Sequence, residues 1–293
     1  MIAPGSATIG FVGTGVMGGP MAGHALAAGY RVVVYTRTRE RAAALLEAGA
    51  EWAASPAALA PLCDAVVTMV GYPTDVEEVY FGDGGLIANA RPGTYLIDCT
   101  TSSPALAARI ARAADERGIH ALDAPVTGGD VGAREARLSI MVGGLADDFA
   151  AVEGLLQVFG ATVVHQGPAG SGQHTKMANQ LAIAASMIGA AEALGYAHAA
   201  GLDPERVLES IGAGSAGSWT LTNLAPRMLA DNFAPGFYVR HFVKDLRIAL
   251  GSAAELGIEL PGAELASRLY ESLVAAGYGG DGTQAIWRLY RDR

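Results

Sequence analysis

One lysine offers the clearest chemistry in this sequence. Lys176 follows a glycine-broken run, residues 170–175, and precedes a nearly uncharged stretch, residues 177–191, which predicts a buried helix. At the mouth of such a helix the lysine stem is buried, and because burial disfavours the ammonium form we expect its pKa to be lowered toward neutrality. Asn179 lies one helical turn further on and can point the same way. These features predict that Lys176 is a proton donor.

A glycine pattern near the N-terminus predicts a nucleotide site. Gly13-Thr14-Gly15-Val16-Met17-Gly18 reads G-x-G-x-x-G and lies between an apolar strand, residues 8–12, and a helical pattern, residues 17–28. Glycines permit a tight turn and a close approach of the backbone to a pyrophosphate, and the helix N-terminus attracts the anion. An ordinary glycine turn is the alternative, but the position within a strand–helix–strand unit favours a dinucleotide.

The end of the second predicted strand, residues 31–35, bears on which dinucleotide binds. NAD sites usually have an acid there, which binds the ribose 2′-hydroxyl, whereas this chain has none until Glu40. Arg37 can stack on adenine and pair with a 2′-phosphate, and Thr36 and Thr38 can add hydroxyl donors. A solvated surface patch is the alternative. The segment therefore predicts NADP as the preferred cofactor, with NAD possible.

Strand and helix patterns alternate through the first half of the chain, and helical patterns alone fill the second. Buried apolar runs separated by helices predict a largely parallel sheet covered on both faces. After about Gly167 the strand patterns stop. We therefore expect an α/β Rossmann-type NAD(P)-binding domain, residues 1–166, followed by an all-helical (all-α) substrate and dimerisation domain, residues 167–293. Within the second domain, helices are predicted over residues 176–200, 204–211, 244–256 and 262–275.

The amino-acid composition and net charge limit the kinds of partner that the protein can bind. Hydrophobic residues make up 51% of the chain and charged residues 17%, which predicts a large buried core. The net charge of -9 argues against nucleic acid as a partner, because no basic stripe is available to displace counterions. The negative net charge does not exclude a small carboxylate substrate, which needs only local positive groups. Cys63 and Cys99 lie in apolar surroundings, so we expect reduced core thiols and no metal site.

The same features bear on location. No basic leader precedes the first predicted strand, so we expect no signal peptide. The apolar stretch 177–194 is interrupted by Asn179, Gln180 and Glu192 and favours a central helix over a membrane span. We expect a cytoplasmic protein that does not enter a membrane. Long helices rich in Ala and Gly predict a homodimer or homotetramer.

Five motifs in order resemble the β-hydroxyacid dehydrogenase family, which includes 3-hydroxyisobutyrate dehydrogenase, tartronate semialdehyde reductase and the glyoxylate/succinic semialdehyde reductases. The resemblance covers nearly the whole chain. It implies an NAD(P)-dependent oxidoreductase that transfers a hydride between nicotinamide and a short 3-hydroxy acid or its semialdehyde. The motifs are Gly10-Phe11-Val12-Gly13-Thr14-Gly15-Val16-Met17-Gly18, Asp98-Cys99-Thr100-Thr101-Ser102-Ser103-Pro104, Asp123-Ala124-Pro125-Val126-Thr127-Gly128-Gly129, the Lys176 segment, and Phe242-Val243-Lys244-Asp245-Leu246.

The resemblance implies that Lys176 is the general acid in reduction and the base in oxidation. An ammonium can stabilise and then protonate the alkoxide that forms when a carbonyl accepts a hydride. A surface lysine at a helix start fits less well, because its charge would oppose the helix dipole. In similar proteins an orienting asparagine stands three or four residues after the lysine. Asn179 and Gln180 occupy these two places, and a purely structural amide is the alternative role. His174 is expected to face solvent or to be structural.

Other positions match by the same resemblance. Thr127-Gly128-Gly129 resembles the family's Ser-Gly-Gly substrate loop, in which a hydroxyl and backbone N–H groups form a nest for a carboxylate; a glycine turn is the alternative. Thr101 matches a residue near the nicotinamide half of the cofactor, and Val70 matches a backbone contact to it. Lys244 matches a position near nicotinamide and substrate, held by Asp245, unless the two are only a charge pair at a helix start.

Two other hypotheses stay open. Imine reductases have a related architecture, but similar enzymes often carry Asp or Tyr in place of Lys176. A non-catalytic cofactor-binding module would have lost that lysine, or gained a basic linker and a further domain, and neither is seen. The sequence leaves open which hydroxy acid or semialdehyde is the substrate.

Overall fold

The structure, a computed structural model, describes residues 2–291 and divides into two compact units, Met1–Lys176 and Met177–Arg293. The boundary expected at residue 166 lies in strand β9 (Gly160–Gly167), whereas the division between the units falls later, inside helix α9 (Ser171–Ala199). Each unit has its own hydrophobic core.

The first unit is built on one nine-stranded sheet with the order β3-β2-β1-β4-β5-β6-β8-β7 and with β9 also paired to β8. The six strands from β3 to β6 pair in parallel, and their order is that of a Rossmann fold. The predicted fold class and the largely parallel sheet are confirmed. These strands are β1 (Thr8–Val12), β2 (Arg31–Tyr35), β3 (Glu51–Trp52), β4 (Ala65–Thr68), β5 (Tyr95–Asp98) and β6 (His120–Asp123).

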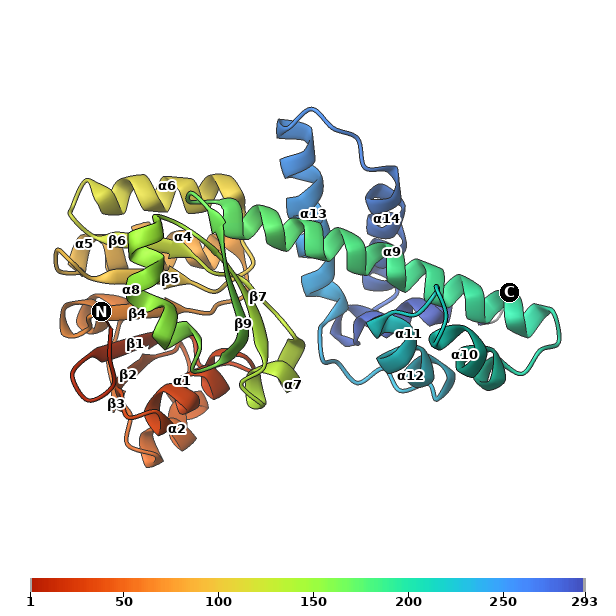
Figure 1. The fold of residues 1–293 in the computed structure, drawn as a ribbon, viewed down its shortest axis with the longest axis horizontal. Coiled ribbons are helices and arrows are strands. Elements are labelled where there is room, and N and C mark those ends of the chain that lie inside the picture. Colours follow the sequence, from red (N-terminus) through yellow and green to blue (C-terminus); the bar gives the residue numbers. More distant parts are fainter. Residues whose placement is uncertain (1, 292–293) are drawn as a thin grey trace. The chain divides into compact units, whose positions relative to one another are not determined.

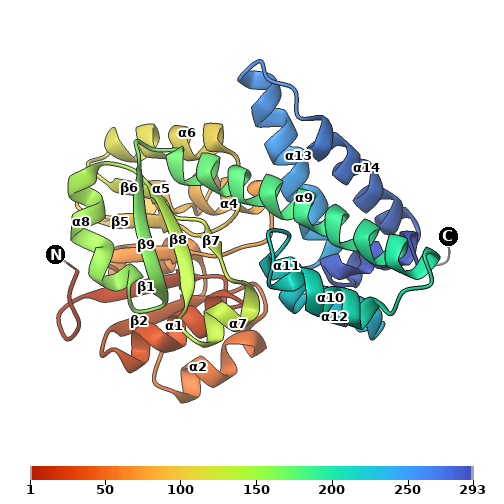
Figure 2. The ribbon, with the colours of Figure 1, turned by 45° about the vertical axis from the view of Figure 1, so that its right-hand side comes forward.

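The far end of the sheet changes direction. β8 (Leu138–Gly143) pairs antiparallel with β6 and with the short β7 (Val126–Thr127), and β9 pairs parallel with β8. Figure 2 shows β7, β8 and β9 side by side. The two-residue strands β3 and β7 were not predicted, because they are too short to carry a periodic pattern.

Helices cover both faces of this sheet because successive strand side chains point to opposite sides. Val32 and Val34 lie in one core cluster, and Val33 lies in the other. The two layers of helices can be followed in Figures 1 and 2. The first cluster contains residues of α1 (Gly18–Ala27), α2 (Ala43–Glu47), α7 (Gly129–Arg134) and α8 (Ala146–Leu156); the second contains residues of α3 (Pro56–Leu59), α4 (Pro73–Phe81), α5 (Leu86–Asn89) and α6 (Pro104–Asp115).

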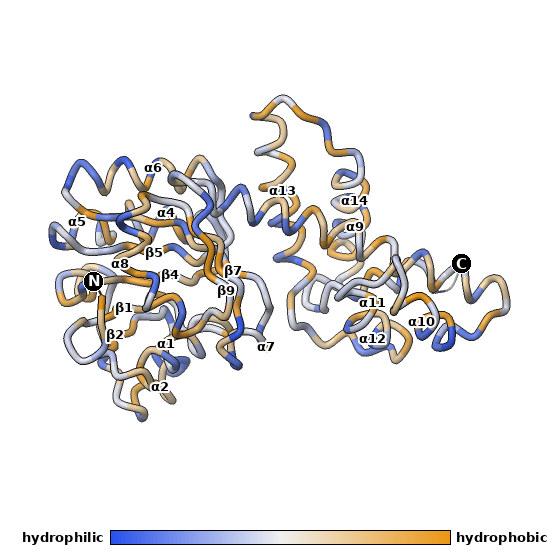
Figure 3. Tube along the Cα trace, viewed as in Figure 1, coloured by the Kyte–Doolittle hydropathy of each residue, from blue (hydrophilic) through white to orange (hydrophobic). Residues whose placement is uncertain are grey.

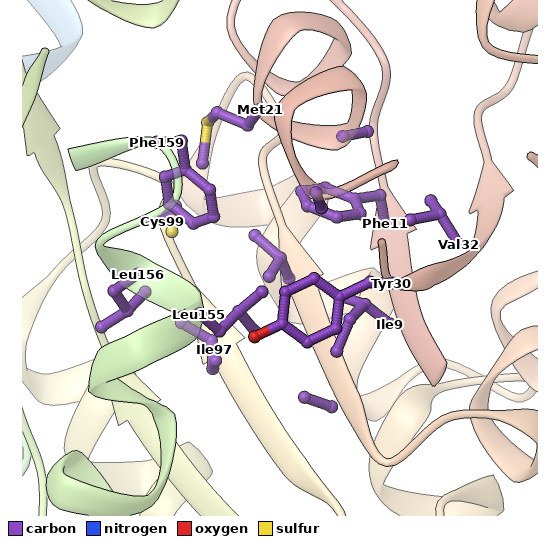
Figure 4. Close-up of a cluster of buried hydrophobic side chains, with 14 of the residues drawn as sticks. Ile9, Phe11, Met21, Tyr30, Val32, Ile97, Cys99, Leu155, Leu156 and Phe159 are labelled. Atoms are coloured by element: carbon purple, nitrogen blue, oxygen red, sulfur yellow. The ribbon is translucent and has the colours of Figure 1, made fainter. Parts of the chain in front are cut away.

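Both cysteines are buried free thiols, as predicted. Cys99 lies among packed apolar side chains that include Phe11, Met21 and Phe159 (Figure 4). Burial raises the pKa of the Cys63 thiol to about 12, so this group stays protonated and unreactive at neutral pH. Along the chain, hydrophobic residues follow the strands of the sheet (Figure 3).

The second unit is helical, as predicted. Its core packs Phe242 edge-on against Tyr270, with ring centroids 4.8 Å apart. Asp203 caps α10 by accepting a hydrogen bond from the Glu205 N–H. None of the helices within residues 2–291 combines the length and hydrophobicity needed to cross a bilayer. The unit contains the later part of α9, α10 (Pro204–Gly212), α11 (Trp219–Asn223), α12 (Ala225–Leu229), α13 (Val239–Glu255), α14 (Pro261–Ala275) and two 3-10 helices, η3 (Tyr278–Gly280) and η4 (Thr283–Leu289).

A 3-10 turn, Arg39–Ala42, precedes α2. Two predicted helix starts were wrong. The helices predicted to begin at Lys176 and Lys244 begin at Ser171 and Val239, so each lysine is the sixth residue of its helix. Lys176 is therefore not at the mouth of a helix, and the argument from an opposing helix dipole does not apply to it, because that effect fades within the first turn.

Candidate active site

The glycine loop after β1 has two glycines that the protein itself requires. Gly13 has a φ of +96°, and a Cβ on it would lie 2.2 Å from the Met69 carbonyl oxygen. A Cβ on Gly18 would lie 2.0 Å from the Gly13 carbonyl oxygen. Larger residues at either place would push β1, α1 and the segment after β4 apart. These two glycines therefore shape the loop, whatever it binds.

Gly15 is different, because a Cβ there would meet nothing within 4 Å. Beside it, the Thr14 hydroxyl is buried and has no hydrogen-bond partner among the described residues. No side chain caps the N-terminus of α1, and no acidic residue occupies its first turn. Open space over a glycine, an unsatisfied hydroxyl and uncapped helix amides fit the close approach of a pyrophosphate. The residues present therefore suit a dinucleotide, with Val16 and Met17 completing the turn.

An acidic side chain does reach the end of β2, although not from β2 itself. Nη1 of the exposed Arg37 lies 3.3 Å from Oδ1 of Asp75, which belongs to α4. The other oxygen of Asp75 accepts a hydrogen bond from the Tyr72 N–H at 3.1 Å. Thr36 is half-buried and Thr38 is exposed. Asp75 was not predicted as part of this site, although a carboxylate three residues after the N-cap residue can accept a hydrogen bond from that residue's N–H.

The segments after β4 and β5 are joined by a hydrogen bond. The Val70 N–H donates to Oγ1 of Thr100 at 3.0 Å, and the Thr100 N–H donates to Oδ1 of Asp98 at 2.9 Å. Thr101, the next residue, is half-buried. Both segments follow the carboxyl ends of parallel strands, the edge at which open α/β sheets bind their ligands. Val70 and Thr101, predicted separately, thus lie in one hydrogen-bonded pair of loops.

Asp123, at the end of β6, fixes the start of α9. Its two carboxylate oxygens accept hydrogen bonds from the Gly170 N–H at 2.7 Å and the Gln173 N–H at 2.8 Å. Burial raises the pKa of this carboxyl, and the N–H donors act in the opposite direction. A Cβ on Gly172 would lie 2.4 Å from the Met141 carbonyl oxygen, so the helix start is packed directly against the sheet.

Lys176 is held next to the predicted substrate loop. Its side chain is buried, and Nζ donates a hydrogen bond to the Val126 carbonyl oxygen at 2.9 Å. Val126 directly precedes Thr127-Gly128-Gly129. Gly128 and Gly129 have φ values of +127° and +64°, which favour glycine, and a Cβ on Gly129 would meet nothing within 4 Å. The structure therefore brings the predicted proton donor and the predicted carboxylate loop together.

In the second unit, two hydrogen bonds and one ion pair join four side chains in a series. Nδ2 of Asn179 donates to Oε1 of Gln180 at 2.7 Å. Nε2 of Gln180 donates to Oδ2 of Asp245 at 2.6 Å, and Nζ of Lys244 lies 3.1 Å from Oδ1 of the same carboxylate. Gln180 and Asp245 are each 1% exposed. The Gln180 amide is thus engaged in the interior at both ends, whereas Asn179 is half-buried.

His174 is exposed, in agreement with the expectation that it faces solvent. Among residues 2–291, no group of three or more His, Cys, Asp or Glu side chains is arranged to hold a metal ion.

Comparison with known proteins finds a matching family for each half of the chain. Residues 8–167 match the NAD binding domain of 6-phosphogluconate dehydrogenase, and residues 170–290 match the NAD-binding domain of NADP-dependent 3-hydroxyisobutyrate dehydrogenase. The chain is 56% identical over 283 residues to an uncharacterised oxidoreductase of Bacillus subtilis, YkwC, covering 97% of this chain and 98% of that one. It is 37% identical to 3-hydroxyisobutyrate dehydrogenase of Pseudomonas aeruginosa, covering 97% and 99%. This chain belongs to the β-hydroxyacid dehydrogenase family.

The fold of this β-hydroxyacid dehydrogenase also matches solved structures. Mycobacterium tuberculosis 3-hydroxyisobutyrate dehydrogenase, determined with L-serine, is 29% identical and superposes with a TM-score of 0.90, covering 99% of this chain and 100% of that one. The protein is therefore an oxidoreductase, an NAD(P)-dependent hydroxyacid dehydrogenase, as the ordered motifs implied.

Proposed function

We propose that this dehydrogenase prefers NADP and interconverts a short 3-hydroxy acid and its semialdehyde, with Lys176 as general acid and base. The observation that carries the proposal is the hydrogen bond from Nζ of Lys176 to the Val126 carbonyl, directly before Thr127-Gly128-Gly129. A bound nicotinamide supplies or accepts the hydride. Lys176 delivers a proton to the oxygen that reduction leaves charged, and removes it in the oxidation direction.

The placement of the lysine supports a short substrate. The Thr127 hydroxyl and the N–H groups of Gly128 and Gly129 offer donors for a carboxylate. Only one residue separates the carbonyl that holds Nζ from Gly128, so carboxylate and reacting oxygen are few bonds apart. L-serine, present with the Mycobacterium tuberculosis enzyme, is such a compound: a carboxylate with a hydroxyl on its third carbon. Asn179 and Lys244 remain candidates for further contacts to the substrate.

The preference for NADP rests on Arg37. β2 ends without an acid, and Arg37 follows it with threonines on both sides. A planar guanidinium suits a 2′-phosphate, although the phosphate must compete with Asp75 for it. Arg37→Asp should weaken NADPH binding and move preference toward NADH, measured as the two dissociation constants by fluorescence titration. An unchanged ratio of the two dissociation constants would show that Arg37 does not bind the 2′-phosphate.

We further propose a homodimer or homotetramer in the cytoplasm, with neither nucleic acid nor membrane as a partner. Exposed Tyr196 and Trp219 on the second unit, at 76% and 68%, support contacts between subunits. Light scattering after size exclusion tests the subunit number. A monomer at micromolar concentration would contradict it.

The test of the activity is a panel of carbonyl substrates with NADPH and NADH. It contains glyoxylate, succinic semialdehyde, methylmalonate semialdehyde, tartronate semialdehyde and a cyclic imine, with L-serine and 3-hydroxyisobutyrate for the oxidation direction. Turnover of one semialdehyde with NADPH is the expected result and selects the substrate. Activity on the imine alone would favour an imine reductase, and tight cofactor binding without any turnover would favour a non-catalytic module.

A further inference from the structure

A buried glutamine ties the loop of Thr101 to the helix of Lys176. The Gln173 side chain is 0% exposed. Its Oε1 accepts a hydrogen bond from the Ser102 N–H at 2.9 Å, and its Nε2 donates one to the Thr100 carbonyl at 2.7 Å. The amide therefore satisfies the main chain on both sides of Thr101, and it is itself satisfied at both ends, as a buried amide must be.

The backbone of Gln173 is anchored as well. Its N–H donates to Asp123, which ends β6 three residues before Val126. Val126 accepts the hydrogen bond from Lys176. Gln173 and Lys176 are three residues apart in α9, so their side chains leave the helix on the same face. Two hydrogen-bonded paths therefore meet at Gln173: one leads to the Thr101 loop, and the other leads to Asp123, three residues before the carbonyl that holds Nζ.

We propose that Gln173 is a positioning residue for the reaction, which holds the Thr101 loop in a fixed place relative to Lys176. The inference rests on the proposed function of Lys176. Thr101 follows the carboxyl end of β5, the edge of the sheet at which a dinucleotide lies. The hydride is delivered to the carbon of a carbonyl group and the proton to its oxygen. The Thr101 loop and the Lys176 side chain must therefore keep fixed positions relative to each other. A misplacement of about 1 Å can lower the rate by about 10²-fold.

Gln173→Met tests this, because methionine has a similar length and makes neither hydrogen bond. We expect kcat to fall by about 10²-fold while the dissociation constant of NADPH changes little. The kinetic isotope effect with NADPH deuterated at C4 should rise, because hydride transfer becomes rate-limiting. Hydrogen exchange at the Ser102 amide, measured without substrate, should become faster because its acceptor is gone.

Gln284→Met is the matched control. Gln284 is a second buried glutamine, 1% exposed, whose Nε2 donates to the main-chain carbonyls of Asn232 and Ala234 in the second unit. This variant should lose thermal stability yet keep the wild-type kcat, isotope effect and Ser102 exchange rate. If Gln173→Met behaves like this control in kcat and isotope effect, or leaves the Ser102 exchange rate unchanged, the positioning role is overturned.

Gln173→Glu gives a second check. A protonated carboxyl can donate to the Thr100 carbonyl and accept from the Ser102 N–H, whereas a carboxylate can only accept. Turnover relative to wild type should therefore rise as the pH is lowered from about 8 toward about 5, and a ratio independent of pH would contradict the proposal. If the wild-type enzyme turned over none of the substrates, the proposed function would be refuted instead. The exchange rate of the Ser102 amide would still distinguish the Gln173→Met variant from the Gln284→Met variant.

Discussion

Lys176 and Lys244 occupy equivalent places in different helices, yet their partners differ in charge. Each is the sixth residue of its helix and is largely buried. Nζ of Lys176 donates to the neutral Val126 carbonyl, whereas Nζ of Lys244 pairs with the Asp245 carboxylate. That carboxylate is held in turn by Gln180.

The difference between these two partners indicates different roles for the two lysines. A hydrogen bond to a carbonyl survives loss of the lysine proton, because a neutral amine still has N–H bonds to donate. The Coulomb attraction to a carboxylate exists only while the lysine is charged. The contact of Lys176 therefore fits its proposed role in proton transfer, and the contact of Lys244 fits a structural ion pair.

Arginine at the two positions separates these roles most strongly. A guanidinium keeps the charge but does not release a proton in a protein. Lys176→Arg should therefore lower kcat by about 10²–10⁴-fold, whereas Lys244→Arg should retain most turnover. Steady-state kinetics on the substrate selected by the panel measures both, and Lys176→Met, which is no longer than lysine, controls for the bulk of arginine. Equal losses from the two arginine variants would refute the distinction.

Stability gives the second contrast. Lys244→Met leaves the Asp245 carboxylate buried without its cation and should cost about 3–5 kcal/mol of unfolding free energy. Lys176→Met leaves the neutral Val126 carbonyl without this donor and should cost about 1–3 kcal/mol. Urea unfolding followed by tryptophan fluorescence measures both. The double variant Lys244→Met/Asp245→Asn should recover most of the loss, and failure to recover would show that charge pairing is not the cause.

The neighbouring amides sharpen the comparison further. Gln180→Met removes a hydrogen bond to a charged group and should cost about 1.5–3 kcal/mol of stability, with little effect on KM. Asn179→Ala should instead raise KM for the carbonyl substrate, because the half-buried Asn179 is a proposed contact of that substrate. Kinetics and urea unfolding of both variants decide the assignment. The opposite pattern would make Gln180 the orienting residue.

Local patterns made part of this site predictable. The Gly13–Gly18 loop, Lys176 and the Lys244–Asp245 pair are each contained in a few consecutive residues, and the alternation of strands and helices predicted a Rossmann-type domain. The structure adds the physical reason for two of the glycines: neighbouring carbonyls leave no room for a Cβ.

The supports of the site were not predictable in this way. Asp123 bonds to residues 47 and 50 positions further along the chain, and Gln173 bonds across 71 and 73 positions. No periodicity within a segment encodes such contacts. The missed helix starts have a related cause. A distant carboxylate caps the start of α9, and no side chain caps α13 after Tyr238, so the sequence carries no local capping signal at either place.

The smallest expected effect concerns a histidine one turn before Lys244. Burial lowers the pKa of His241, and the positive charges of Lys244 and Arg240 lower it further, while Asp245 acts in the opposite direction. Folding thus favours the neutral imidazole. Its contribution to stability is present above the unfolded pKa of about 6.5 and is lost as the pH falls through the lower folded value. His241→Gln should therefore narrow the difference in Tm between about pH 8 and about pH 5, with exposed His198→Gln as the matched control. An equal Tm difference in wild type and His241→Gln would mean that folding does not lower the pKa of His241.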